Sequence, residues 1–104
     1  MKFYVAASLD NVEKHREVSQ RLAAEGHDLT FDWTEIGDVR SSTTRMSEVS
    51  QAEVLGVQDA DFVIVLLPGG RGAHVELGMA LGLGKYVFLI PDVPWENVRP
   101  SAFY

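Results

Sequence analysis

The residues with the clearest chemical potential lie in the segment 68–78, whose sequence is PGGRGAHVELG. A glycine-rich turn there leads from an apolar run into an apolar helix. Glycines let a ligand approach the backbone closely, and a helix start offers free N–H groups and the positive end of a dipole. We therefore expect Gly69, Gly70 and Gly72 to contact a ligand. The alternative is a tight strand-to-helix connection whose glycines serve geometry alone.

Glu76 follows these glycines, and we expect it in the first turn of the helix. A buried carboxylate needs a partner, and the helix N-terminus would hold it ionised through the dipole and through N–H contacts. An ionised carboxylate that faces a crevice suits a nucleophile or a stabiliser of an oxocarbenium ion. The alternative is a glutamate that caps its own helix.

Three further side chains are candidates for ligand binding. Arg71 could grip a phosphate or carboxylate with its planar guanidinium, or it could be a solvated loop charge. His74 precedes Glu76 by two residues, so the two side chains diverge on a helix, although His74 could reach a substrate from the loop side. Trp33 could stack on an aromatic base or pack in the core.

Composition excludes several classes of protein. The chain has 104 residues, which fits one domain, residues 1–104, at roughly 100–200 residues per domain. The absence of cysteine excludes disulfides, thiolate zinc sites and cysteine nucleophiles. His15, His27 and His74 lack the spacing of metal ligands, so we expect neither a metal nor another cofactor. The net charge of −6 would repel a phosphate backbone, so no nucleic acid polymer is expected as a partner.

The sequence also shows no segment typical of membrane insertion or export. The longest apolar run, Phe62–Leu67, is far too short to span a bilayer. Residues 1–7 are apolar but lack the charged start and the cleavage site of a signal peptide. We therefore expect no membrane partner and a cytoplasmic location.

Hydrophobic spacing predicts strands alternating with helices. The expected strands are Lys2–Ala7, Leu29–Trp33, Asp61–Leu67 and Tyr86–Ile90. The last two are apolar throughout, which predicts that they are covered on both faces. The expected helices run from Asp10 or Asn11 to Gly26, from Arg45 to Gln58, and from Ala73 to Leu83. Glu13 would complete a capping box on the first helix. The third helix would be buried, with Gly78, Gly82 and Gly84 allowing close approach to the sheet.

This alternation predicts an α/β fold with a parallel sheet and helices on both faces. We expect the strand order 2-1-3-4 of a small flavodoxin-like (Rossmann-like) sheet. Ligands of such sheets bind beyond the carboxyl ends of the strands, at the switch point between strands 1 and 3. That position gathers the segments 4–10, 33–44 and 68–72 around one crevice.

Three segments together resemble the nucleoside 2-deoxyribosyltransferase superfamily, which includes 2′-deoxynucleoside 5′-phosphate N-hydrolases and CMP hydrolases. They are KFYVAAS with Tyr4, AEVLGVQDAD with Glu53, and GGRGAHVELGMALGLGKYV with Glu76. The resemblance implies that Glu76 is the nucleophile that attacks the anomeric carbon and that Tyr4 orients it. It implies that Glu53 binds or protonates the leaving base, and that Ser8 lies near a 5′-phosphate.

The chain departs from this family at two places. Gly70 stands where the nucleoside transferases have Asp and the nucleotide hydrolases have Ser, so neither mode of substrate recognition is marked there. Family members also continue further and use C-terminal residues to complete the neighbouring subunit's site, a part that Asn97 or Ser101 could take here. The resemblance further implies a homodimer.

The expected activity is cleavage or transfer of the N-glycosidic bond of a nucleoside or nucleoside 5′-monophosphate through a covalent glycosyl–Glu76 intermediate. Ser8 and Arg71, together with the lack of an acidic residue at position 70, favour a hydrolase of monophosphates. If Glu53 and Glu76 share a pocket, their repulsion should raise one pKa and create an acid. A non-catalytic nucleotide-binding module and a flavodoxin-like redox protein are the alternatives.

Overall fold

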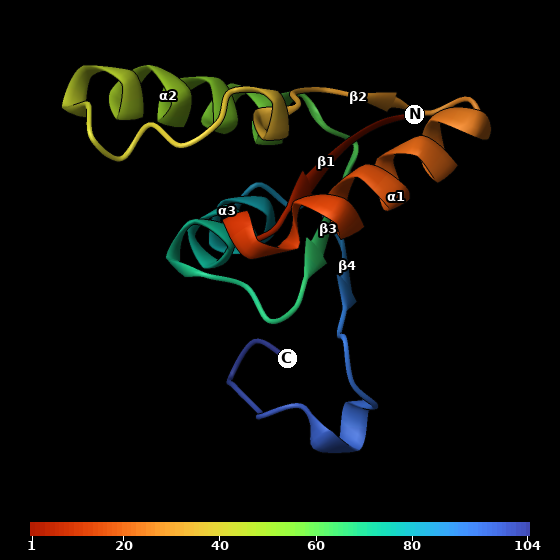
Figure 1. Cartoon of the computed structure of the whole chain (residues 1–104). Coiled ribbons are helices and arrows are strands. Elements are labelled where there is room, and N and C mark those ends of the chain that lie inside the picture. Colours follow the sequence, from red (N-terminus) through yellow and green to blue (C-terminus); the bar gives the residue numbers. More distant parts are fainter.

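The computed structural model describes all 104 residues as a four-stranded parallel sheet with helices on both faces (Figure 1). The strands are β1 (Lys2–Ala6), β2 (Asp28–Leu29), β3 (Phe62–Leu66) and β4 (Tyr86–Ile90). The helices are α1 (Val12–Ala24), α2 (Thr43–Asp59) and α3 (Arg71–Gly82). Short 3-10 turns cover Leu9–Asn11, Trp33–Glu35 and Trp95–Asn97. The strand order β2-β1-β3-β4 confirms the predicted α/β fold.

The two faces of the sheet carry separate apolar clusters because side chains alternate along each strand. Tyr4, Val63 and Val65 face α2 and α3. Phe3, Val5 and the facing residues of β3 lie instead on the side of α1. Tyr4 pairs with Val63 in the parallel register, so β1 and β3 end together at the edge where the glycine-rich turn begins.

The second strand is shorter than predicted, because Trp33 belongs to a 3-10 turn rather than to a strand. The Asp32 side chain accepts the N–H of Thr34 at 3.0 Å. The indole N–H of Trp33 donates to the Val5 carbonyl at 2.9 Å. These local side-chain bonds take the place of further ladder hydrogen bonds, so the alternating pattern of this segment misled the prediction.

The ends of the helices also differ from the prediction in detail. The capping box on α1 is absent: its N-cap Asn11 makes no side-chain hydrogen bond, and the helix follows a 3-10 turn instead. Gly26, at φ +90°, ends the turn after α1 as expected. Helix α2 begins at Thr43 because the Ser42 hydroxyl accepts the N–H of Arg45 at 3.2 Å, which is a standard cap.

Two predictions of burial are wrong. Gly78 and Gly82 of α3 face open space, since a Cβ on either would meet no heavy atom within 4 Å, and Val75 on the same helix is 62% exposed. In β4, Tyr86 is 73% and Phe88 is 54% exposed. The reason is topological: β4 is an edge strand, and α1 packs over β1 and β2 rather than over β4.

Gly56 on α2 is the glycine that the core does require. A Cβ there would lie 3.0 Å from a ring carbon of Tyr4 and 3.0 Å from the Cβ of Phe31. Tyr4 is fully buried, so its ring has little room to retreat. The backbone of α2 therefore packs directly against the ring of Tyr4.

Replacing Gly56→Ala should lower the free energy of unfolding by about 1–3 kcal/mol, because the added methyl overpacks the ring of Tyr4. Gly78→Ala is the matched control on α3. It adds the same methyl to a helix where nothing opposes it, so it should raise stability by up to about 1 kcal/mol. Urea unfolding of both variants measures the difference, and equal effects of the two substitutions would contradict the close contact.

Candidate active site

The centre of the candidate site is a contact between a strand and a helix across the core. Tyr4 lies in the middle of β1, and its hydroxyl donates a hydrogen bond to Oε2 of Glu76 on α3. Tyr4 is 0% and Glu76 is 4% exposed. The structure thus brings together two predicted residues that are 72 positions apart in the chain.

Burial controls the acidity of this pair. Burial raises the pKa of Glu76 to about 8; the Tyr4 hydroxyl lowers it by donating to the carboxylate, and the nearby Glu53 raises it further. Burial, followed by the charge and hydrogen bond of Glu76, also raises the pKa of the Tyr4 hydroxyl. The phenol therefore stays protonated and acts as a hydrogen-bond donor.

The predicted state of Glu76 needs correction. We expected the helix N-terminus to hold this side chain ionised from the first turn. Because α3 begins at Arg71, Glu76 lies in the second turn, where the influence of the dipole has faded. With a pKa of about 8, Glu76 holds its proton at neutral pH in the free protein.

Glu53 is the third member of the cluster. It is half-buried on α2, one turn before Gly56 and on the same side of the helix. Its charge raises the pKa of both Glu76 and Tyr4, which places its carboxylate near both groups. Three elements thus supply one side chain each: β1, α2 and α3.

The end of β1 lies beside the glycine-rich turn. A Cβ on Gly70 would lie 3.9 Å from the Cβ of the half-buried Ser8. Gly69 cannot carry a side chain, because its Cβ would lie 2.9 Å from that of Ala73. Gly70 is the N-cap of α3 and makes no side-chain cap, so the first N–H groups of the helix have no side-chain partner. Gly70 thus lies close to Ser8, and contact of Gly69 and Gly70 with a ligand stays a prediction.

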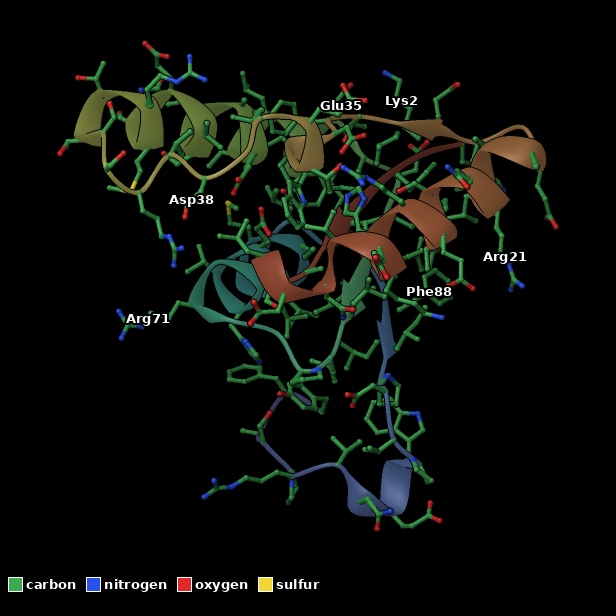
Figure 2. The ribbon with its side chains drawn as sticks, viewed as in Figure 1. Lys2, Arg21, Glu35, Asp38, Arg71 and Phe88 are labelled. Carbon is green, nitrogen blue, oxygen red and sulfur yellow. The ribbon has the colours of Figure 1, made fainter.

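Arg71 and Gly72 lie on the outside of this turn, and both are exposed. Figure 2 shows Arg71 projecting away from the body of the molecule. Its guanidinium makes no salt bridge, in contrast to Arg40, which pairs with Asp38 through contacts of 2.9 Å. Contact of Arg71 with a ligand stays a prediction.

His74 joins the glycine-rich turn to the C-terminal segment. Its Nδ1 donates to the Gly70 carbonyl at 2.9 Å, and its Nε2 lies 3.0 Å from the Tyr104 hydroxyl. Tyr104 of the same chain therefore reaches the turn, which sequence reasoning missed while naming Asn97 and Ser101. A contribution of Asn97 or Ser101 to the site of a neighbouring subunit stays a prediction. No pattern of spacing in the sequence relates Tyr104 to the glycine-rich turn, so this contact could not be predicted.

Trp33 packs in the apolar cluster that also contains Tyr4 of β1. Its side chain is 7% exposed, and its ring meets the buried His15 edge-on, with centroids 4.9 Å apart. With the indole N–H committed to Val5, the structure gives Trp33 a packing role, and contact with a base stays a prediction.

Tyr4 and Glu76 are closed to solvent in this state, whereas Glu53 keeps part of its surface exposed. Two hollows, of about 470 and 730 Å³, lie elsewhere, one along α2 and the other along β4. With Glu76 only 4% exposed, a substrate must displace neighbouring side chains to reach the carboxyl. No group of three or more His, Asp or Glu side chains is arranged to hold a metal ion. None of the helices has the length and apolar content needed to cross a membrane.

The fold and the cluster define a small parallel α/β domain with a tyrosine and two glutamates at the switch point of the sheet. Residues 3–97 match the nucleoside 2-deoxyribosyltransferase family, and the chain belongs to that family. Membership implies a nucleoside or nucleotide as the substrate class.

A solved structure supports the fold independently. The chain is similar to CMP N-glycosidase BcmB from Clostridium botulinum with a TM-score of 0.66 and 15% sequence identity. The match covers 91% of this chain and 75% of the other. No curated protein matches the chain significantly.

The raised pKa of Glu76 predicts a change of stability with pH. The folded protein keeps a proton that the unfolded chain releases between about pH 4.5 and 8, so stability falls as the pH rises through that range. Glu76→Gln removes this penalty. Its gain in unfolding free energy over wild type should grow from pH 4.5 to pH 8 by about 1–4 kcal/mol, at about 1.4 kcal/mol per pKa unit.

Urea unfolding at several pH values measures this gain. Glu48→Gln removes an exposed carboxylate from α2 and serves as the control, with a difference from wild type that stays flat. A flat difference for Glu76→Gln would show that the buried carboxyl is not protonated in the folded protein.

Proposed function

We propose that this protein cleaves the N-glycosidic bond of a nucleoside 5′-monophosphate with Glu76 as the nucleophile. The observation that carries the proposal is the buried Glu76 carboxyl, which accepts from Tyr4 and lies beside Glu53. Cleavage of this bond needs a carboxylate at the anomeric carbon and an acid near the base. In our proposal Glu76 supplies the carboxylate and Glu53 supplies the acid.

The two glutamates divide one proton between them in this scheme. Substrate binding shifts the proton from Glu76 to Glu53, which creates a nucleophile and an acid in one step. An Oε atom of Glu76 then forms a bond to C1′, the C1′–N bond breaks, and the base nitrogen leaves with the proton of Glu53. Water attacks C1′, gives its proton to Glu53 and restores the carboxylate of Glu76.

The surroundings of Ser8 support a phosphate on the substrate. Its side chain adjoins Gly70 and the start of α3, whose first N–H groups have no side-chain cap. Helix N-termini of this kind bind phosphate through N–H groups and the dipole. The absence of an acidic side chain at Gly70 agrees with an anionic substrate, and water as acceptor makes the protein a hydrolase rather than a transferase.

A non-catalytic nucleotide-binding module is the second candidate. The low exposure of Glu76 favours it, because a closed cluster could persist as core structure after turnover is lost. The enzyme and the binding module would bind the same nucleotide, but only the enzyme would release its base.

Intact-protein mass spectrometry after brief exposure to nucleosides and their monophosphates tests the proposal. Wild type and the control Glu48→Gln should gain the mass of the sugar phosphate on Glu76 and release the base. Glu76→Gln should do neither, with a loss of activity of at least about 1,000-fold. Release of base at an undiminished rate by Glu76→Gln would rule out this nucleophile, and thermal stabilisation without any product would establish the binding module.

Tyr4→Phe should show whether the Tyr4 hydroxyl acts on Glu76 or only supports the fold. The Tyr4 hydroxyl lowers the pKa of Glu76, so its removal should raise that pKa and move the alkaline loss of kcat/KM, where the pair gives up its shared proton, from about pH 8 to higher pH. Because a more basic Glu76 passes its proton to Glu53 less readily, we expect about tenfold lower kcat/KM at neutral pH. A pH–rate profile measures this shift, and a uniform loss at every pH would contradict it.

A further inference from the structure

The C-terminal segment, residues 91–104, has no part in the proposed chemistry, yet it returns to the glycine-rich turn. Figure 1 shows it leaving the end of β4 and curving back toward the loop that joins β3 to α3. The ring of Tyr104 is half-buried and packs against the apolar cluster that contains Tyr4. Its hydroxyl lies 3.0 Å from Nε2 of His74 in the first turn of α3. The segment is therefore attached to the turn by both packing and a hydrogen bond.

The last residues of this segment are held in a defined shape by their own hydrogen bonds. The N–H of Ser101 donates to the backbone oxygen of Tyr104 at 2.9 Å, and the N–H of Phe103 donates to the Ser101 hydroxyl at 3.1 Å. These two bonds close residues 101–104 into a turn. The position of the Tyr104 ring is thereby restricted before any ligand arrives, which lowers the entropy cost of using its hydroxyl as an anchor.

His74 links Tyr104 to the backbone of the glycine-rich turn. The Gly70 carbonyl accepts two hydrogen bonds from His74, one from its backbone N–H at 3.2 Å and one from Nδ1 at 2.9 Å. The imidazole also lies beside Gly69, where a Cβ would come 3.5 Å from Cε1 of His74. Glycine has more backbone freedom than any other residue, so these side-chain contacts restrict the turn. Tyr104 restricts the imidazole in the same way, with the two ring centroids 6.0 Å apart.

The bond to the Gly70 carbonyl also determines where the first N–H of α3 points. The carbonyl of Gly70 and the N–H of Arg71 belong to one peptide unit, which is planar and trans, so the two groups point in opposite directions. Because the carbonyl is directed into the helix toward His74, the N–H of Arg71 is directed out of the helix start. Ser8 lies beside the same Gly70. A rotation of this peptide would turn the N–H away from an anion bound there.

We propose that His74 and Tyr104 are positioning residues that hold the Gly70–Arg71 peptide with its N–H toward the 5′-phosphate of the substrate. This inference rests on the phosphate site of the proposed function. Tyr104 acts through His74, and His74 acts through the Gly70 carbonyl. The two side chains set the preference for a monophosphate over the nucleoside without phosphate, because a turn that is already in the binding conformation loses less entropy on binding.

Titration calorimetry with ribose 5-phosphate and 2-deoxyribose 5-phosphate tests this role without requiring turnover. Tyr104→Phe keeps the packed ring and removes only the hydroxyl, so it should weaken binding of the sugar phosphate that wild type prefers by about three- to tenfold. His74→Ala removes both contacts and should weaken binding at least as much. Tyr86→Phe is the matched control, because it removes the hydroxyl of a 73% exposed tyrosine on β4, and it should bind as wild type does.

A double-mutant cycle shows whether Tyr104 acts through His74. In the His74→Ala background, Tyr104→Phe should cause no further loss of affinity, because the hydroxyl has already lost its partner. His74→Asn retains a side-chain N–H for the Gly70 carbonyl and should restore part of the affinity. Circular dichroism checks that every variant is folded at the temperature of the titration, since a merely structural role would lower Tm and leave the Kd of the folded protein unchanged.

Turnover supplies a second measurement. For release of base from a nucleoside 5′-monophosphate, Tyr104→Phe should raise KM by the same factor as Kd and keep kcat within about twofold of wild type. Release of base from the matching nucleoside should not change.

Wild-type affinity in Tyr104→Phe, or losses from the two single substitutions that simply add, would overturn the proposal. So would a wild type that binds neither sugar phosphate, even if it releases base from nucleosides. Failure of the proposed function gives a different result, since the variants would then still differ in their affinity for the sugar phosphate while none of them, nor the wild type, releases base.

Discussion

The burial of the Glu76 carboxyl group constrains how the other elements of this small domain pack. Burying Glu76 is unfavourable unless a donor meets it, and the Tyr4 hydroxyl is that donor. The phenol reaches the carboxyl only if β1 and α3 keep a fixed spacing, and its ring fits only because α2 presents Gly56 to it. The contact therefore fixes the relative positions of three elements, and the rest of the packing must accommodate them.

The same contact explains how two similar side chains could take different chemical roles. Glu76 is enclosed among apolar neighbours, whereas Glu53 keeps part of its surface in solvent. Burial holds a proton on Glu76, and the Tyr4 hydroxyl opposes that effect. In the proposed mechanism a bound ligand reverses this balance and releases the proton of Glu76, which frees its carboxylate to act as the nucleophile.

Much of the fold could be predicted because the chain alternates clear strand and helix patterns, and parallel crossovers permit few arrangements. The pairing of Tyr4 with Glu76 was expected from the family resemblance rather than from the pattern of strands and helices, and the structure bears it out through the hydrogen bond between the two side chains. The protonation of Glu76 could not be predicted, because it depends on burial and on a two-residue difference in where α3 begins.

The exposure of β4 escaped sequence reasoning for a related reason. A run such as YVFLI reads the same whether a neighbouring element of the chain covers it or not, and only the assembled sheet shows that it lies at an edge. The contact of Tyr104 with His74 is likewise invisible in sequence, since it joins two segments that no periodicity relates.

The hydrogen bond between His74 and Tyr104 has a property that follows from the chemistry of the imidazole and the phenol. The Gly70 carbonyl can only accept, so the imidazole keeps a hydrogen on Nδ1 whatever its charge. A neutral ring then receives the phenolic hydrogen at Nε2, while a cationic ring gives its own hydrogen to the phenolic oxygen. Because a hydroxyl serves equally as donor and acceptor, Tyr104 can complete this hydrogen bond with either polarity, and the side chain of residue 104 thereby joins the tail to the turn.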